Sequence, residues 1–257
     1  MRKLFKIIST ILVISTTFTC LIGTASAQSP DWLWAKSIGG TLGNYSQAQS
    51  MALDDSGNVY TTGTFRGTID FDPGPGVFNL TSIGGGYNDM FISKLDSSGN
   101  FVWVKQIAGS ESSTEGYSIA LDASGNIYTT GSFNGTVDFN PGVETFNLTS
   151  TGGRYGWSEI FVSKLSSSGN FVWAKAMGGT EDAYGTAIAI DGSGNIYTIG
   201  NFSDTCDFDP GVGAYNLISK GYTDIFITKL DSSGNLFWAK TIGGTLYDFG
   251  RDRKSVV

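Results

Sequence analysis

Short runs of alternating hydrophobic and polar residues recur along the chain in the same order three times. In the first repeat these runs cover residues 48–53, 58–65, 90–95 and 101–107. Each run is rich in β-branched or aromatic residues and is bounded by Gly, Asn, Asp or Ser, which is typical of β-strands. The second repeat has the corresponding runs at 117–121, 126–133, 160–165 and 171–177, and the third at 187–190, 195–202, 225–230 and 236–242. No amphipathic helical pattern appears after the first 27 residues.

The last run of each repeat carries a tryptophan that marks the period. Trp34, Trp103, Trp173 and Trp238 are separated by 69, 70 and 65 residues. A repeat of this length that holds four short strands is typical of a β-propeller blade. The prediction is therefore an all-β β-propeller with about three four-stranded blades of an incomplete ring. We expect the tryptophans to pack between the blades.

Six short turns connect the strands within the repeats, and each has glycine directly before asparagine. The glycines, which serve as structural repeat anchors together with the four tryptophans, are Gly57, Gly99, Gly125, Gly169, Gly194 and Gly234. A hairpin of this length needs a residue with positive φ, and the Asp or Ser that leads the turn can accept backbone hydrogen bonds. The same turns weakly resemble calcium loops, but each offers at most one carboxylate and residues 166–170 offer none. We therefore predict no cofactor, with calcium at these turns as the alternative.

A longer segment with its own motif joins the second and third strands of each repeat. It covers residues 67–74, 135–142 and 204–211, and each copy ends in Pro-Gly. Alternating residues continue on both sides of that dipeptide, which predicts that strands two and three extend outward and pair around a Pro-Gly turn. Cys206 stands where the other copies have Ile69 and Val137, so we expect it to be a buried hydrophobic residue rather than a reactive thiol.

Residues 1–27 have the features of a signal peptide: a basic start, an uncharged apolar run and Ala25-Ser26-Ala27 as a cleavage site. A membrane anchor is the alternative, although several Ser and Thr residues interrupt the run. Cleavage before Gln28 leaves no other membrane span, and it lowers the net charge from −7 to −10 because the segment holds three basic and no acidic residues. Nucleic acid is an unsuitable partner for such a chain. The absence of histidine excludes Ser-His-Asp and Cys-His nucleophile systems within these residues.

The recurring motifs carry a family resemblance. They are Asp-x-Ser-Gly-Asn-Ile-Tyr-x-Thr-Gly, Phe-x-x-Lys-Leu-x-x-Ser-Gly-Asn and Phe-x-Trp-Ala-Lys-x-x-Gly-Gly, and they extend from Asp31 to about Gly250. This pattern resembles the secreted bacterial SBBP-type β-propeller repeats. The resemblance implies a ring of nominally seven blades in large exported proteins whose activity is mostly unassigned. With three full repeats, this sequence departs from that ring.

The phase of the repeat predicts the domain organisation. After the signal peptide, residues 28–44 form an orphan closing strand that lacks the three strands before it; in a closed propeller such a strand completes the final blade. Blades one, two and three cover 45–110, 111–179 and 180–244. Residues 245–251 begin a truncated next blade, and 252–257 depart from the repeat and are interpreted as a non-native tail.

Propeller topology places all six glycine turns at one end of the strands and the Pro-Gly segments at the other, which we call the extension face. Acidic and aromatic residues gather there. The candidate binding residues are Asp70, Asp72, Tyr87, Asp138, Tyr155, Trp157, Asp207, Asp209 and Tyr222, with Glu111, Glu115, Glu181 and Asp182 in the loops between blades. Because the Asp-Phe-Asp/Asn motif occurs in every repeat, a structural role for its carboxylates is favoured over a catalytic one.

These observations predict a non-catalytic protein, secreted or at the cell surface, with a binding, scaffold or adhesion role. Its partner is expected to be an extracellular protein or a glycan. The alternative is a carbohydrate-active enzyme or a lectin-like glycan-binding propeller. A unique polar cluster that breaks the repeat would favour the enzyme, and the sequence shows only Arg154 to Trp157 as such a segment.

Overall fold

A computed structural model describes residues 33–151 and 156–251. The predicted signal peptide, candidate residue Tyr155 and the predicted tail 252–257 lie outside the described residues. The described strands belong to one compact unit, Trp34–Val257. Within the described residues, no helix is both long and apolar enough to cross a bilayer.

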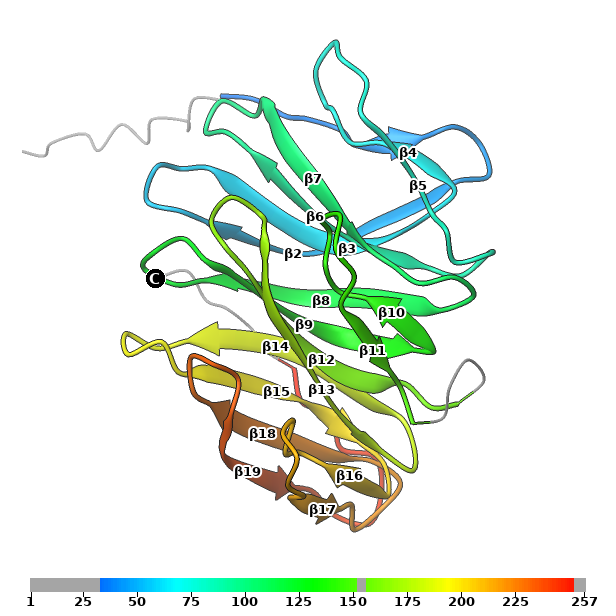
Figure 1. The fold of residues 1–257 in the computed structure, drawn as a ribbon, viewed down its shortest axis with the longest axis vertical. Helices are drawn as coiled ribbons and strands as arrows, with labels where there is room; N and C mark the ends of the chain where they lie inside the picture. The colour runs from blue at the N-terminus through cyan, green and yellow to red at the C-terminus, as the bar shows by residue number, and fades with distance from the viewer. Residues whose placement is uncertain (1–32, 152–155, 252–257) are drawn as a thin grey trace, which may run out of the picture. The chain divides into compact units, whose positions relative to one another are not determined.

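Three blades with four antiparallel strands each confirm the all-β prediction (Figure 1). The first blade consists of β2 (Tyr45–Leu53), β3 (Val59–Arg66), β6 (Asp89–Leu95) and β7 (Phe101–Ile107). The second consists of β8 (Ser113–Leu121), β9 (Ile127–Asn134), β12 (Glu159–Leu165) and β13 (Phe171–Gly179). The third consists of β14 (Ala183–Ile190), β15 (Ile196–Phe202), β18 (Asp224–Leu230) and β19 (Leu236–Ile242). The sheets pack in chain order, with β8 against β2 and β3 and with β14 against β8 and β9, and the described residues do not close a ring.

The segments between strands two and three form small hairpins, as predicted, but not as continuations of the main strands. They are β4–β5 (Thr68–Asp70, Asn79–Thr81), β10–β11 (Thr136–Asp138, Asn147–Thr149) and β16–β17 (Thr205–Asp207, Asn216–Ile218). A residue with positive φ ends the extended strand before each hairpin. These residues are Gly67 (83°), Gly135 (77°) and Asp204 (51°). A left-handed residue cannot continue a strand, so the hairpin turns away from its own sheet.

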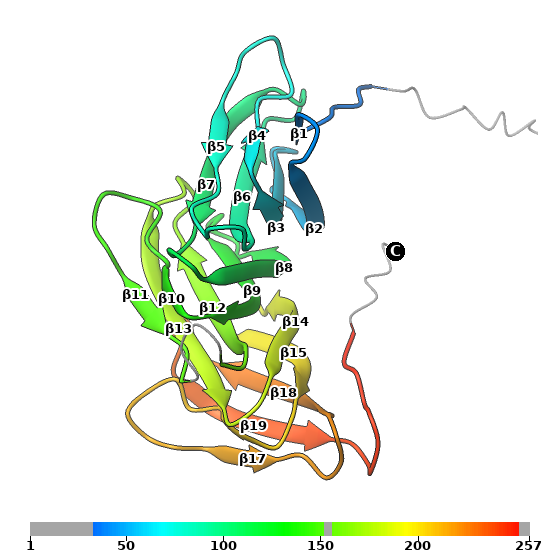
Figure 2. The same ribbon diagram turned by 90° about the vertical axis from the view of Figure 1, so that its right-hand side faces the viewer.

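Each hairpin instead pairs with the end of the preceding repeat. The short strand β1 (Gly39–Gly40) pairs with β4, Ala108 bridges to Asp138 in β10, and the end of β13 pairs with β16. Figure 2 shows β5 and β11 on one side of the sheets and the first strands β2, β8 and β14 on the other. The extension hairpins therefore connect neighbouring blades through backbone hydrogen bonds.

The core of each repeat contains three phenylalanines, one of which belongs to the hairpin motif. In the second repeat, Phe139 is fully buried, and its ring centroid lies 5.5 Å from that of Phe133 and 5.0 Å from that of Phe161. Phe71 and Phe208 occupy the equivalent positions. Burial of this ring fixes the hairpin to the blade. Cys206 is also buried, as its position in the motif predicted.

The tryptophan of one repeat contacts a turn glycine of the next. A Cβ atom on Gly169 would stand 3.3 Å from the Trp103 ring, and one on Gly234 would stand 3.3 Å from the Trp173 ring. Trp34 makes the same contact with the turn of the first blade, and its Nε1 donates to the Ser97 carbonyl at 3.1 Å. Residues 34–40 thus pack on the first blade as the last strand of one repeat packs on the next.

Candidate functional site

The carboxylates at the glycine-turn end are bonded within their own turns. Asp122 Oδ1 accepts the backbone N–H groups of Ser124 and Asn126, both at 2.9 Å, and Oδ2 accepts Asn126 Nδ2 at 2.8 Å. Asp54, Asp96, Asp191 and Asp231 repeat this arrangement. The carboxylate of the first turn is therefore Asp54 and not its neighbour Asp55. All six turn glycines have φ between 75° and 81°, as predicted.

These turns leave little capacity for a metal. Hydrogen bonds from Asn100 lower the pKa of Asp96, and hydrogen bonds from Asn195 lower that of Asp191. In the described part of the chain, no group of three or more Cys, Asp and Glu residues is arranged to hold a metal ion. The turn carboxylates accept hydrogen bonds from the backbone of their own turns.

The aspartates of the extension motif are also bonded to backbone. Asp138 Oδ1 accepts the N–H of Asn140 at 2.9 Å and that of Phe146 at 2.8 Å, which ties the two ends of the hairpin loop together. Asp70 and Asp207 do the same in their repeats. Asp72 and Asp209 accept the N–H of the glycine two residues later. The structure therefore separates these candidates into three hairpins and gives each a local role.

The aromatic candidates lie at one equivalent position in the three repeats. Tyr87, Trp157 and Tyr222 each precede by two residues the first residue of the third strand, and their exposed fractions are 37%, 47% and 62%. We call these three residues the aromatic row. Tyr222 also stacks on Tyr247, with ring centroids 4.9 Å apart. The row presents ring surface to solvent at the extension face.

A second set of carboxylates was missed from the sequence. Asp89, Glu159 and Asp224 are buried at the start of the third strands. Asp89 Oδ2 accepts the Ile83 N–H at 2.8 Å and Gln106 Nε2 at 2.7 Å, and burial raises the pKa of this carboxyl group. The recurrence of an acidic residue before each third strand was the available signal. These side chains hold the loop that carries the aromatic row.

A cavity of about 390 Å³ opens at the extension face between the three repeats. Its lining includes Tyr87 from the first repeat, Glu115 and Tyr117 from β8, and Tyr184 from β14. Glu115 was expected in a loop, but β8 begins two residues before it, so its side chain is held by a strand. We call this cavity the rim pocket.

Hydrogen bonds fix the polar groups of the rim pocket. Glu115 Oε1 accepts Asn88 Nδ2 at 2.8 Å, and Glu115 Oε2 accepts the Tyr117 hydroxyl at 2.5 Å. Burial, and then the hydrogen bond to Glu115, raises the pKa of Tyr117; burial and the charge of Asp182 raise that of Tyr184 to about 12. Both phenols are therefore neutral at physiological pH.

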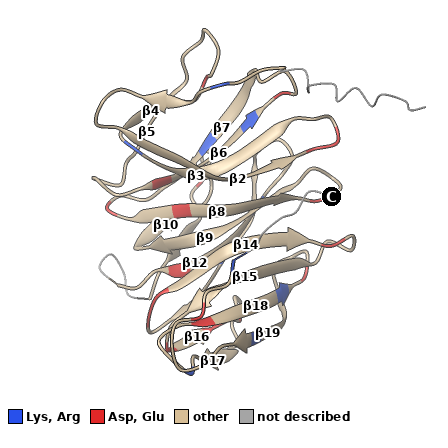
Figure 3. Cartoon of the chain, turned by 180° about the vertical axis from the view of Figure 1, so that it is seen from behind, with Lys and Arg blue, Asp and Glu red and all other residues tan. Residues whose placement is uncertain are grey.

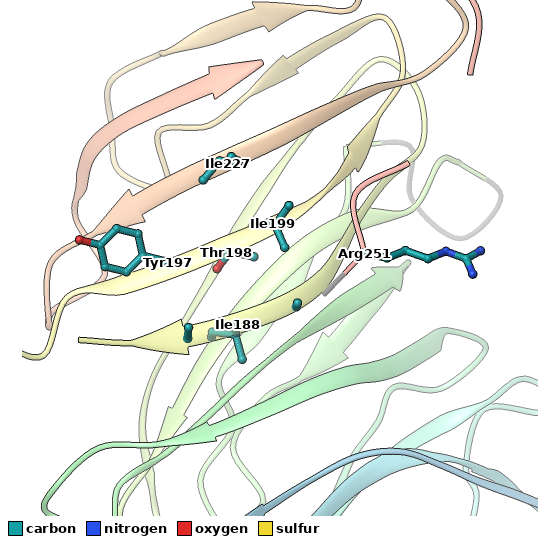
Figure 4. A pocket seen from close by; sticks show the side chains of 8 residues that line it. Ile188, Tyr197, Thr198, Ile199, Ile227 and Arg251 are labelled. Carbon is teal, nitrogen blue, oxygen red and sulfur yellow. The ribbon is translucent and has the colours of Figure 1, made fainter. Parts of the chain in front are cut away.

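A second hollow belongs to the packing between blades. Figure 4 shows an apolar pocket of about 230 Å³ on the third blade, with Ile188, Ile199 and Ile227 around it and Arg251 beside it. Ile92 and Val162, which occupy the position of Ile227 in the first two blades, are fully buried by the following blade. This pocket is thus an inter-blade surface rather than a ligand site.

Figure 3 shows acidic residues at the turns and on β8, and basic residues on β6, β7 and β18.

Comparisons with known proteins agree with the fold. Residues 33–64 and 102–137 match the family model described as the β-propeller repeat SBBP. The chain is 26% identical over 250 residues to an uncharacterized WD repeat-containing protein of Acanthamoeba polyphaga mimivirus, an alignment that covers 85% of this chain and 17% of that protein. It is 27% identical over 93 residues to the regulatory protein FlaEY of Caulobacter vibrioides, which covers 36% of this chain and 10% of FlaEY. The chain therefore spans less than a fifth of either curated relative. The repeats, the four-stranded sheets and these matches make it a β-propeller repeat protein.

Proposed function

We propose that this chain is a non-catalytic binding module, secreted or displayed at the cell surface, that contacts an extracellular protein or glycan through its extension face. The observation that carries the proposal is the aromatic row. Tyr87, Trp157 and Tyr222 expose large rings at one register of three successive repeats. Exposed aromatic groups at a fixed spacing are typical of surfaces that bind a macromolecule.

The surrounding carboxylates support a binding role over catalysis. Glycoside hydrolysis needs two carboxylates placed across one bond. The extension aspartates occur one or two to a hairpin, and each has an oxygen that accepts backbone N–H groups. Such groups position loops and are poorly suited to proton transfer.

Export is the part of the proposal that rests on the sequence of residues 1–27. Expression of the full chain in a bacterial host with an intact secretory pathway should release a mature protein that begins at Gln28. N-terminal sequencing of the exported protein measures this directly. Retention of Met1 in a membrane fraction would instead support the anchor.

Binding can be measured with fluorescently labelled full-length chain on intact bacterial cells. We expect saturable binding that falls at least about tenfold when Tyr87, Trp157 and Tyr222 are all changed to Ala, because hot spots concentrate in aromatic residues. Changing Val143 and Val212 to Ser is the matched control, since both are fully exposed on extension loops. Equal binding by the triple variant would overturn the proposal.

The lectin-like alternative has one observation in its favour. The Tyr222 and Tyr247 rings stack with an interplanar angle of 14°, and both are more than 60% exposed. Such a flat pair could carry a sugar ring. Periodate treatment of the cells, together with a glycan array, separates the two partners: loss of binding after periodate favours a glycan, and loss after protease favours a protein.

A further inference from the structure

We propose that the rim pocket binds a protonated amine, and that the lysine side chain of a protein partner supplies it. This inference rests on the proposed function and names the chemistry of the partner. Glu115 provides the negative charge, and the hydroxyl groups of Tyr117 and Tyr184 lie near it in the same cavity.

Tyr117 lies at a β-bulge. Along the β8–β9 ladder, Gly116 pairs with Gly131 and Ser118 pairs with Thr130, so Tyr117 is the extra residue. A bulge re-aims the side chain of the inserted residue. In β8 the phenol of Tyr117 donates to the carboxylate of Glu115, two residues earlier in the same strand. Residues two apart in a strand share a face, and Tyr45 and Gln47 in β2 form the same kind of contact.

The other repeats keep the bulge but not the chemistry. The inserted residues are Gln49 in β2 and Thr186 in β14, and the residues equivalent to Glu115 are Gln47 and Tyr184. The backbone of the bulge is thus a property of the fold, whereas the Glu–Tyr pair occurs in the second blade alone. Residues that break a repeat at one position are better candidates for ligand contact than residues that every repeat shares.

The charge and the donors in the pocket favour an amine over a neutral ligand. Both Glu115 oxygens accept a hydrogen bond from a neutral donor, and a carboxylate can accept more. Among the described residues no Lys or Arg forms a salt bridge with Glu115, and none lines the cavity. The Tyr117 hydroxyl already donates to Glu115, so its remaining capacity is to accept. A pocket that presents one negative charge and further acceptors complements the three N–H donors of an ammonium group.

The cavity is also of suitable size and access. Its volume of about 390 Å³ exceeds that of a lysine side chain, and Tyr87 at its lining is 37% exposed. Ser132 is buried, and its hydroxyl donates to Tyr117 at 3.3 Å, which holds the phenol in place. The pocket is therefore preformed, which limits the conformational entropy lost on binding.

The probe is Nα-acetyl-lysine methylamide, titrated into the full-length chain and followed by NMR shift changes and calorimetry at low salt. Nα-acetyl-norleucine methylamide is the neutral comparison. We expect the lysine probe to bind at least about tenfold more tightly than the norleucine probe, since only the former pairs with the carboxylate.

Two variants test the assignment. Glu115→Gln keeps the size and the acceptor but removes the charge, and it should weaken the lysine probe at least about tenfold. Tyr117→Phe should weaken it by a smaller factor. Glu144→Gln is the matched control, because it removes one charge at an exposed position in the extension loop of the same repeat, outside the rim pocket. If Glu115→Gln and Glu144→Gln bind the probe equally, or if the norleucine probe binds as well as the lysine probe, the inference is wrong.

Failure of this inference can be distinguished from failure of the proposed function. If the chain binds cells through the aromatic row while Glu115→Gln has no effect on the lysine probe or on cell binding, this inference fails and the proposed function stands. If neither the cells nor the probe bind, both fail. A melting temperature for Glu115→Gln that equals that of the unchanged chain shows that any loss is not due to unfolding.

Discussion

The two ends of the same β-strands differ in how their polar residues are used. At the glycine-turn end, Asp or Ser side chains accept backbone N–H groups within their own hairpin, and five of the six turns share one arrangement. At the extension end, the aspartates of the hairpins also recur in every repeat. Residues within the first strands β2, β8 and β14, however, differ from repeat to repeat. Glu115, Tyr184 and Gln47 occupy one equivalent position. The comparison indicates that backbone geometry requires the pattern that every repeat shares, while the side chains that differ at the extension end are free to serve binding.

The largest effect is expected where the sheet leaves no room for a side chain. A Cβ atom on Gly131 would stand 1.8 Å from the Glu115 carbonyl oxygen, which is backbone and cannot move aside cheaply. Gly131→Val should therefore lower the free energy of unfolding by at least about 4 kcal/mol, measured by urea denaturation. The control is Gly192→Ala, since a Cβ there would meet no atom within 4 Å. Equal midpoints for the two variants would mean that the bulge at Tyr117 can rearrange freely.

The next largest effect concerns the ring that attaches the extension hairpin. Phe139 is fully buried between Phe133 and Phe161, so Phe139→Ala should cost about 3 to 4 kcal/mol of unfolding free energy. Phe146, in the same hairpin, is 38% exposed, and Phe146→Ala should cost less than half as much. Similar losses of unfolding free energy for both variants would show that the exposed ring of Phe146 also attaches the hairpin to the blade.

A smaller effect at the glycine turns depends on pH. The folded pKa values of Asp96 and Asp191 lie below their ordinary value of 3.8 because their carboxylates accept hydrogen bonds from Asn100 and Asn195. The stability that they contribute is present above pH 3.8 and is lost as the pH falls through the lowered folded values. The urea midpoint of the unchanged chain should therefore decrease below about pH 4.

The turn between β12 and β13 in the second blade supplies the control for that pH dependence. Ser166 stands where the other turns have Asp, and its hydroxyl accepts the Asn170 N–H at 3.2 Å. Ser166→Asp should raise the urea midpoint at pH 7 and steepen its decrease in acid, while Ser166→Ala should do neither. An unchanged acid profile for Ser166→Asp would argue against the role assigned to the turn carboxylates.

The smallest effect on stability is expected in the aromatic row. Trp157 is 47% exposed, so Trp157→Ala should change the free energy of unfolding by no more than about 0.5 kcal/mol. Cell binding should nevertheless weaken several-fold. Denaturation and binding measured on one preparation separate the two properties, and a large loss of stability would assign Trp157 to the core instead.

The sequence predicted most of the fold and only part of the site. The four strands of each repeat, the turn glycines and the buried position of Cys206 followed from local pattern. The interruption between β3 and β4 was not predicted. An outward continuation of the strand and a left-handed turn at Gly67 both fit the same alternation of hydrophobic and polar residues. The candidate aspartates were found by residue type, but only the tertiary structure shows that their carboxylates already accept backbone N–H groups.

The sequence alone determined the period, the strand order and the places where the chain must turn, since these depend on residues close together along the chain. Tertiary structure alone decided the rim pocket. It combines Tyr87, Glu115 and Tyr184 from three repeats, and it depends on one bulged residue in β8 and on the packing of neighbouring blades. Neither can be read from the local pattern, because both depend on how β8 pairs and packs with other strands.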